Sequence, residues 1–261
     1  MEATHVAAGA LTGLVVGMTG VGGGALMTPI LVLLFGTAPL TAVGTDLWFA
    51  AVTKLAVSGL HLRRRLIDWP IVRRLWLGSL PASVLTVFWM STRQLDRSSV
   101  ALVRTAIAVA VCVTAVGLLA DKPLAAWRAR AGSSPERSPL RWEAAATVLA
   151  GATLGALVTL TSVGAGALGV VVLAHLYAAR LTPPRLVATD IAHAIPLALC
   201  AGIGHLAISQ VDLALLRDLL IGSIPAALAG AVLSSHVSHG VLRAVLGAVL
   251  LLVGVTLFSA R

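Results

Sequence analysis

Two stretches of the chain are near copies of each other and decide its fold. The segment GALTGLVVGMTGVGGGAL at residues 9–26 lines up with GATLGALVTLTSVGAGAL at residues 151–168, with 10 of 18 positions identical. After a two-residue adjustment, residues 43–83 line up with residues 187–227, with 14 identities in 41. Both copies are apolar and interrupted by glycine. This pattern predicts a duplicated membrane unit of the kind that builds transporters.

The composition also indicates a membrane protein. Of the 261 residues, 58% are hydrophobic and 11% are charged, whereas soluble domains carry about 25% charged residues. There are 19 Lys and Arg against 10 Asp and Glu, and the surplus lies in the short segments 61–74 and 122–141 between apolar runs. Such a bias is typical of cytoplasmic loops and does not indicate a nucleic-acid partner.

The chain is predicted to be an all-α polytopic membrane protein, because a span needs about 20 apolar residues. The first and the fifth apolar segments are too long for one straight span. TGVGGG at 19–24 and TSVGAG at 161–166 place residues of low helix propensity inside them. We expect both segments to be broken, or re-entrant, at these motifs. The eight predicted segments are 6–35, 40–60, 70–90, 99–120, 142–177, 184–208, 213–234 and 240–259.

The duplication predicts a membrane repeat at 1–120, a basic cytoplasmic linker at 121–141 and a second membrane repeat at 142–261. If each broken segment crosses once, each repeat has four spans and the repeats share one orientation. If each broken segment enters and returns, each repeat crosses three times and the repeats are inverted. The positive-inside rule places the Arg63–Arg65 loop and the linker in the cytoplasm in both schemes, so charge leaves the choice open.

The first copy contains GMTGVGGGALMTPILVLLFG at 17–36, AVGTDLWFAAVTK at 42–54, HLRRRLIDW at 61–69 and GSLPA at 78–82. The second contains TSVGAGALG at 161–169, VATDIAHAIPLAL at 187–199, GIGHLAISQVDL at 202–213 and GSIPAAL at 222–228. These motifs resemble the sulfite exporter TauE/SafE family, also described as the toluenesulfonate uptake permease family. The resemblance implies a multi-pass plasma-membrane carrier of sulfite, a sulfonate or a related anion, driven by an ion gradient without ATP. The family name favours export, and an anion channel or a carrier of a non-sulfur organic anion are the alternatives.

The glycine motifs are the first candidates for an anion site. The N-terminus of a half-helix exposes unpaired N–H groups and the positive end of the helix dipole, which suits a sulfite or sulfonate oxygen. The alternative is close packing of helices through small residues. The substrate-binding candidates are Thr19, Gly20, Gly22, Gly23, Gly24, Thr161, Ser162, Gly164, Gly166 and Lys54.

Charged residues inside the apolar segments are the second group of candidates. Asp46 and Asp190 recur in both copies, and each is expected either to face a cavity or a partner, or to cap a helix near the interface. In the deep position they would bind a coupling proton or cation, with His193 at i+3 from Asp190. Lys54 corresponds to Ala198 in the second copy. It is expected to neutralise Asp190 across the repeats or to meet the anion, with snorkelling toward the basic loop as the alternative.

The remaining polar features are expected to be structural. Asp68 and Asp212 precede apolar segments, where a negative charge complements the helix dipole, and Pro81 and Pro225 are interpreted as helix kinks. The sequence predicts no metal site, because no His, Cys and carboxylate set converges, and it predicts neither a cofactor nor a catalytic set for an intramembrane enzyme. The expected partners are the anion, the coupling ion and membrane lipid, and a homodimer is left open.

Overall fold

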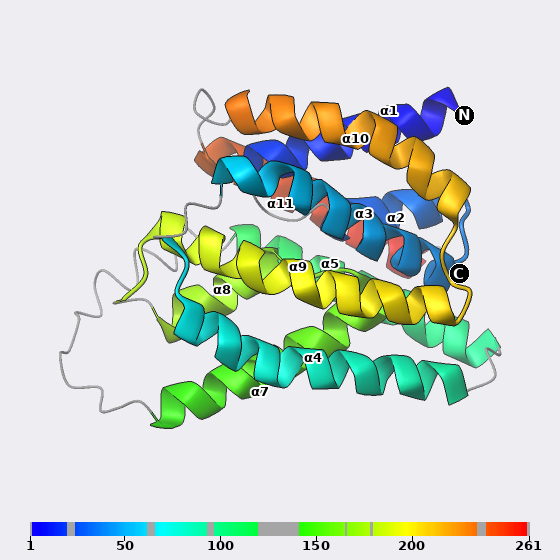
Figure 1. Cartoon of the computed structure of the whole chain (residues 1–261). Coiled ribbons are helices and arrows are strands. Elements are labelled where there is room, and N and C mark those ends of the chain that lie inside the picture. The colour runs from blue at the N-terminus through cyan, green and yellow to red at the C-terminus, as the bar shows by residue number, and fades with distance from the viewer. Residues whose placement is uncertain are drawn as a thin grey trace.

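The computed structural model describes residues 2–19, 24–61, 66–92, 97–119, 141–164, 166–177, 180–233 and 239–259. These residues form helices and connections without any strand, so the all-α prediction is confirmed. The helices of the first half are α1 (Ala3–Thr19), α2 (Gly24–Leu33), α3 (Pro39–His61), α4 (Trp69–Thr92) and α5 (Arg97–Leu119) (Figure 1). Those of the second half are α7 (Arg141–Thr161), α8 (Ala167–Leu176), α9 (Pro183–Ala207), α10 (Leu213–Leu233) and α11 (His239–Ser259).

Most of these helices have the length and composition of membrane spans. In the described part of the chain, six are long and apolar enough to cross a membrane: α3, α4, α5, α7, α9 and α10. The 24 residues of Trp69–Thr92 extend about 36 Å at 1.5 Å per residue, which exceeds the roughly 30 Å of bilayer hydrocarbon. By contrast, α2 and α8 have ten residues each, or about 15 Å. The chain is a multi-pass membrane protein with two half-length helices.

In the described residues, each of the two long apolar segments is divided into two helices. α1 ends at Thr19 and α2 begins at Gly24, while α7 ends at Thr161 and α8 begins at Ala167. In the second break, Ser162, Gly164 and Gly166 have φ angles of 57°, 119° and 137°. Positive φ is incompatible with a right-handed helix, so α7 cannot continue into α8. Gly20, Gly22, Gly23 and the linker residues 121–140 lie outside the described residues.

The first helix of each half packs along a helix of the other half. Small residues let the backbones approach so closely that a Cβ atom would meet the partner helix, which is the packing that glycine permits in membranes. The contacts pair Gly9 with Leu219, Gly13 with Ser223 and Gly17 with Ala227 between α1 and α10, and Gly151 with Leu75 and Gly155 with Ser79 between α7 and α4. The residue numbers rise together in each pair, so α1 is parallel to α10 and α7 is parallel to α4. These pairs lie along opposite edges of the molecule (Figure 1).

Helix α3 also runs parallel to α10. The backbone N–H of Asp212 donates to Thr45 Oγ1 at 3.0 Å, and the hydroxyl oxygens of Thr53 and Ser223 lie 2.8 Å apart. Because α1 and α3 are both parallel to α10, the short helix α2 between them runs back toward the end where α1 began. The first broken segment is therefore a helical hairpin.

The second half follows the same plan in the opposite direction. α9 is parallel to α4, because Asp68 N–H donates to Thr189 Oγ1 at 3.1 Å and Ser79 Oγ lies 3.0 Å from His193 Nε2. Since α7 is parallel to α4 as well, α8 runs back in the same manner as α2. The two halves meet along α3 and α9, which are antiparallel: Thr41 Oγ1 donates to Gln210 Oε1 at 3.2 Å and Trp48 Nε1 donates to the Gly202 carbonyl at 2.9 Å.

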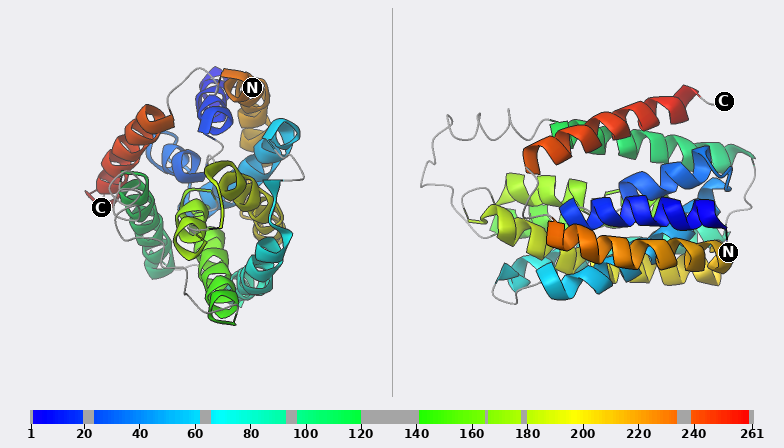
Figure 2. Two further views of the ribbon diagram at one scale, coloured as in Figure 1. Left: turned by 90° about the vertical axis from the view of Figure 1, so that its left-hand side faces the viewer. Right: turned by 90° about the horizontal axis from the view of Figure 1, so that it is seen from above.

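Helices α5 and α11 close one flank of the bundle. They lie side by side (Figure 2), and Gly247 and Gly254 of α11 face Leu119 and Cys112 of α5 in antiparallel order. The described core is largely continuous from these two helices to α3 and α9. Residues of both hairpins, Ala25 of α2 and Val158 of α7, belong to this core, and Ser162 and Gly164 of the second break are buried.

Replacing Gly155 by alanine is expected to lower the thermal unfolding midpoint markedly. A Cβ at this position would lie 2.7 Å from Ser79 Cα, and such overpacking costs about 1–3 kcal/mol. Gly117→Ala is the matched control, because its Cβ would first meet the Val171 side chain at 3.4 Å, an ordinary contact. Thermal unfolding in detergent measures both variants. Equal midpoints would contradict the close approach of α7 and α4.

Candidate functional site

Asp46 and Asp190 lie deep inside their helices. Asp46 is seven residues after Pro39, the first residue of α3, and Asp190 is seven residues after Pro183, the first residue of α9. Seven residues correspond to about 10 Å of helix, and both carboxylates are buried. Neither residue caps its own helix, so the interfacial-cap interpretation is wrong.

The carboxylate of Asp46 joins the two broken segments. Its Oδ2 accepts hydrogen bonds from the backbone N–H of Thr28 at 3.1 Å and from the Thr28 hydroxyl, so it binds the N-terminal part of α2. Ser162, in the break of the other half, lies beside the same carboxyl group. Asp46 Oδ1 and Ser162 Oγ are buried, and neither has a hydrogen-bond partner of ordinary geometry among the described residues. The position therefore retains hydrogen-bonding capacity.

Asp190 occupies the matching place against α8. It lies so close to Gly169 that a Cβ there would collide with Asp190 Oδ1. Helix α8 has the sequence ALGVVVLAHL, which contains no serine or threonine, so it offers no hydroxyl of the kind that Thr28 gives to Asp46. In the described part of the chain, the buried Oδ1 of Asp190 has no hydrogen-bond partner. Asp190 instead interacts electrostatically with Lys54.

Lys54 is the electrostatic centre of the site. Its side chain comes from α3 and is only 2% exposed, so it does not snorkel toward the basic loop. It attracts Asp190 of the other half and Asp46 of its own half. His193, also buried, is a further electrostatic neighbour of Lys54, and its Nε2 lies 3.0 Å from Ser79 Oγ. We call Lys54, Asp46, Asp190 and His193 the central cluster.

Thr19, Thr161 and Gly166 lie at the ends of the helices beside the two breaks. Thr19 and Thr161 end α1 and α7, and each donates its hydroxyl hydrogen to the carbonyl four residues earlier at 2.7 Å. Gly166 is the N-cap of α8 and makes no side-chain cap hydrogen bond. The start of a helix has N–H groups that the helix itself leaves unsatisfied. The N-terminus of α8 therefore has the character of an anion-binding position.

The threonine before each buried aspartate binds the other half of the chain. Thr45 Oγ1 accepts from Asp212 N–H at 3.0 Å, and Thr189 Oγ1 accepts from Asp68 N–H at 3.1 Å. Asp212 and Asp68 in turn accept from the backbone N–H three residues later. This confirms the expectation that they stabilise helix N-termini. We call these two related contacts the Thr–Asp clasps, one at each end of the bundle.

Three residues near the cluster were not predicted from the sequence. Ser79 belongs to the repeated GSLPA motif, whose serine recurs as Ser223, and that repetition was a usable signal. Thr28 and Gly169 occur in one copy only, so nothing in the repeat pattern marks them. All three contact the cluster directly.

Comparison with known proteins identifies the family. The family model described as Sulfite exporter TauE/SafE matches residues 5–257. The chain belongs to this family. A relative of the chain, "Probable membrane transporter protein YjnA" of Bacillus subtilis (strain 168), is 34% identical over 268 residues, which cover 98% of this chain and 100% of the relative. No solved structure matches the chain. This TauE/SafE protein is a membrane transporter and not an enzyme.

Proposed function

We propose that this protein is a secondary transporter that binds one small oxyanion, sulfite or a sulfonate, at the central cluster. The observation that carries the proposal is Lys54, a lysine that is 2% exposed at the junction of the two halves. A buried charge inside a membrane segment is costly and is kept where it serves a function. Its ammonium group gives the anion a counter-charge. Like the family description, this proposal favours sulfite as the substrate and export as the direction.

The breaks are proposed to supply the neutral donors of the site. The N-terminal N–H groups of α8, after Gly164 and Gly166, would bind the oxyanion together with Ser162, whose hydroxyl oxygen is buried. Thr161 and Thr19 end the helices that lead into the two breaks. On the side of α2 the same role is proposed for the glycine motif, which comprises Gly20, Gly22, Gly23 and Gly24.

We propose that the net charge of the central cluster couples anion binding to proton binding. With Asp46 and Asp190 ionised, Lys54 positive and His193 neutral, the central cluster carries one net negative charge. A singly charged anion would double this charge in a medium of low dielectric constant, where like charges repel strongly. A proton on one of the two carboxylates restores the balance. We therefore propose Asp46 and Asp190 as the coupling residues, with His193 as their neighbour for proton transfer. In this scheme one proton moves with each anion, so export requires an outward anion gradient that exceeds the opposing proton gradient.

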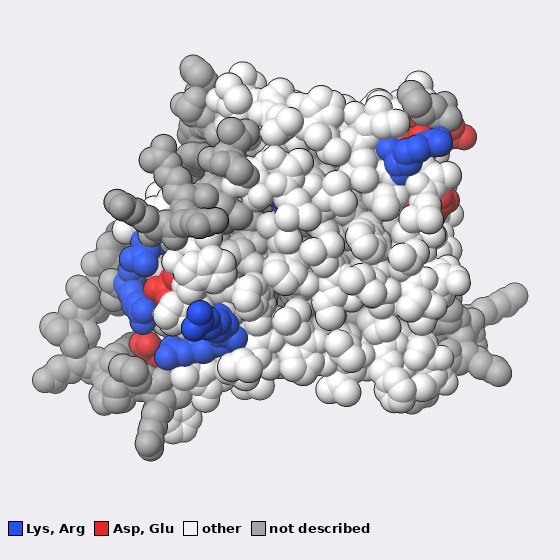
Figure 3. All heavy atoms as spheres, in the orientation of Figure 1, with Lys and Arg blue, Asp and Glu red and all other residues white. Residues whose placement is uncertain are grey.

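The helix directions support the inverted arrangement of the two repeats, 1–120 and 142–261. In this topology the hairpins α1–α2 and α7–α8 are re-entrant from opposite sides, each repeat crosses three times, and both termini are outside. The Lys and Arg side chains visible in Figure 3 gather chiefly at the end of the bundle opposite the N-terminus of the chain. The positive-inside rule assigns that end to the cytoplasm. One Thr–Asp clasp lies at each end of the bundle. Rocking of one repeat against the other would therefore open the two ends alternately.

Flux measurements in proteoliposomes test the transport proposal. The purified protein is expected to move sulfite in a saturable manner, and a pH-sensitive dye is expected to report proton movement in the same direction. A panel of sulfonates and non-sulfur organic anions determines the preferred substrate. Flux that follows the membrane voltage without saturating would identify a channel and contradict the proposal.

Asp190→Asn is expected to separate proton movement from anion movement. The amide cannot take up a proton. Sulfite exchange should therefore persist, while the number of protons moved per sulfite falls about tenfold, a factor that corresponds to about 1.4 kcal/mol. The same holds for Asp46→Asn. Asp218→Asn is the matched control, because Asp218 lies near the start of α10 beside Arg217, at 3.0 Å. If the proton-to-sulfite ratio is unchanged in both cluster variants, these residues do not couple transport.

A further inference from the structure

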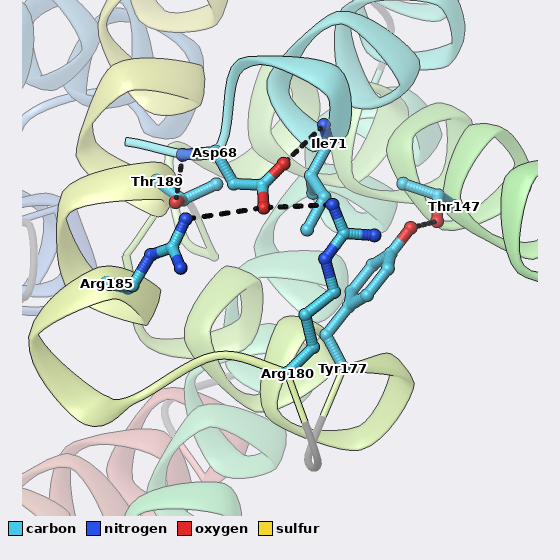
Figure 4. Close-up of polar contacts among 7 residues, drawn as sticks. All are labelled: Asp68, Ile71, Thr147, Tyr177, Arg180, Arg185 and Thr189. Atoms are coloured by element: carbon cyan, nitrogen blue, oxygen red, sulfur yellow. Dashed lines mark hydrogen bonds and ion pairs between the residues drawn. The ribbon is translucent and has the colours of Figure 1, made fainter. Parts of the chain in front are cut away.

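One end of the bundle carries two arginines on a single carboxylate. Arg180, in the connection between α8 and α9, and Arg185, in the first turn of α9, both reach Oδ2 of Asp68 (Figure 4). The Nη2 atoms lie 3.2 Å and 3.6 Å from this oxygen. The other oxygen, Oδ1, accepts from Ile71 N–H at 3.4 Å. Asp68 is 4% exposed, and the two arginine side chains are 53% and 37% exposed. Water therefore reaches the arginines while the carboxylate is buried.

Asp68, Arg180 and Arg185 together have an excess of positive charge and of hydrogen-bond donors. Two guanidinium groups share one carboxylate, so the net charge is plus one. Each guanidinium carries five N–H donors, and the Nε of Arg185 is buried without a hydrogen-bond partner among the described residues. Leaving such a donor unpaired is energetically unfavourable. An oxyanion bound between the two guanidiniums would supply both the missing charge and the missing acceptor.

The hydrogen bonds of a Thr–Asp clasp form without any arginine. At the other end, Thr45 and Asp212 form the same hydrogen bonds, and no ion pair to Asp212 occurs within the described residues. Arg180 and Arg185 are therefore an addition on one side only. Arg180 is also placed by Tyr177, whose ring centroid is 6.0 Å away and whose hydroxyl lies 2.6 Å from Thr147 Oγ1.

The arginine pair is linked to the central cluster through Asp68 and Thr189. The backbone N–H of Asp68 donates to Thr189, and the next residue along α9 is Asp190 of the central cluster. From these contacts we propose that Arg180 and Arg185 form a second anion site, specific for sulfite-sized oxyanions, at the arginine-bearing mouth of the transporter. An ion pauses there between the water and the central cluster. The choice of oxyanion rests on the proposed function, whereas the existence of the site rests on the arginine geometry.

Equilibrium binding of radiolabelled sulfite to the purified full-length protein in nanodiscs tests this proposal. The unmodified protein is expected to bind two ions per chain. The double variant Arg180→Gln/Arg185→Gln should lose one of them and retain the central one, whereas Lys54→Met should lose only the central one. Arg217→Gln is the matched control, because Arg217 also pairs with an aspartate and is 62% exposed, yet lies in α10. It should still bind two.

Chemical protection supplies a measurement that needs no variant. Methanesulfonate is expected to slow the labelling of Arg180 and Arg185 by phenylglyoxal, mapped by mass spectrometry, and to leave that of Arg217 unchanged. Two ions bound by the double arginine variant, or equal labelling with and without methanesulfonate, would overturn the second site. Undiminished binding in Lys54→Met would instead overturn the central site and the proposed function, so the two failures are distinguishable.

Discussion

Replacing Lys54 by methionine is expected to abolish sulfite transport. Methionine keeps the length and the apolar stem of the side chain but removes the only cation described in the central cluster, which leaves Asp46 and Asp190 without their counter-charge. Removing one partner of a buried charge pair costs about 3–5 kcal/mol. Where this cost falls on anion binding, the initial rate of sulfite transport is expected to decrease about 100-fold or more. Initial rates of sulfite flux in proteoliposomes, normalised to monodisperse protein, measure the effect.

A charge-matched double variant separates folding from binding. In Lys54→Met/Asp190→Asn, one positive and one negative charge are removed together, so the net charge of the cluster and the stability of the fold should return toward those of the unmodified protein. If Lys54 binds the anion directly, transport remains lost in this variant. Recovery of sulfite transport would show that Lys54 acts only as the partner of Asp190.

Gly169→Ala is expected to reduce transport by about tenfold or more, because overpacking of about 1–3 kcal/mol displaces Asp190, which we propose as a coupling residue. The added methyl group would occupy the position of Asp190 Oδ1, so the carboxylate must leave its place against α8. Transport rates and the thermal unfolding midpoint are measured together. The expected result is a large loss of rate with the protein still folded.

Gly117→Ala again provides the comparison for this variant. It adds the same methyl group to a transmembrane helix, but at a position that meets only the Val171 side chain at 3.4 Å. Its transport should equal that of the unmodified protein. A Gly169→Ala variant that transports as fast as Gly117→Ala would contradict the placement of Asp190 at the start of α8.

Local properties of the sequence predicted much of this fold. Apolar length located the helices to within a few residues, because the bilayer thickness fixes how long a span must be. The glycine motifs located the breaks, because a run of glycines disfavours helix wherever it stands. The direction of α2 and α8 after the breaks was not predictable, since it depends on contacts with distant helices, such as Thr53 with Ser223.

The site also combines features that the local sequence predicts with features that depend on tertiary contacts. The repeated Thr-Asp pairs marked Asp46 and Asp190, but the sequence left both a deep position and an interfacial cap open. Their depth follows from where α3 and α9 begin, and each helix begins seven residues before its aspartate. Thr28 binds Asp46 through a tertiary contact between positions eighteen residues apart, and no periodicity or repetition records such a contact.

The first helix of each half packs against the other half, and this has a consequence for the origin of the chain. Because α1 covers its glycine face with α10, and α7 covers its own with α4, neither half can bury that face by itself. A half-length ancestor would have needed a second copy, inserted upside down, to supply the missing helix. A two-fold axis in the membrane plane relates such copies. In the inverted arrangement proposed above, the polypeptide thus has the architecture of an antiparallel homodimer within one chain.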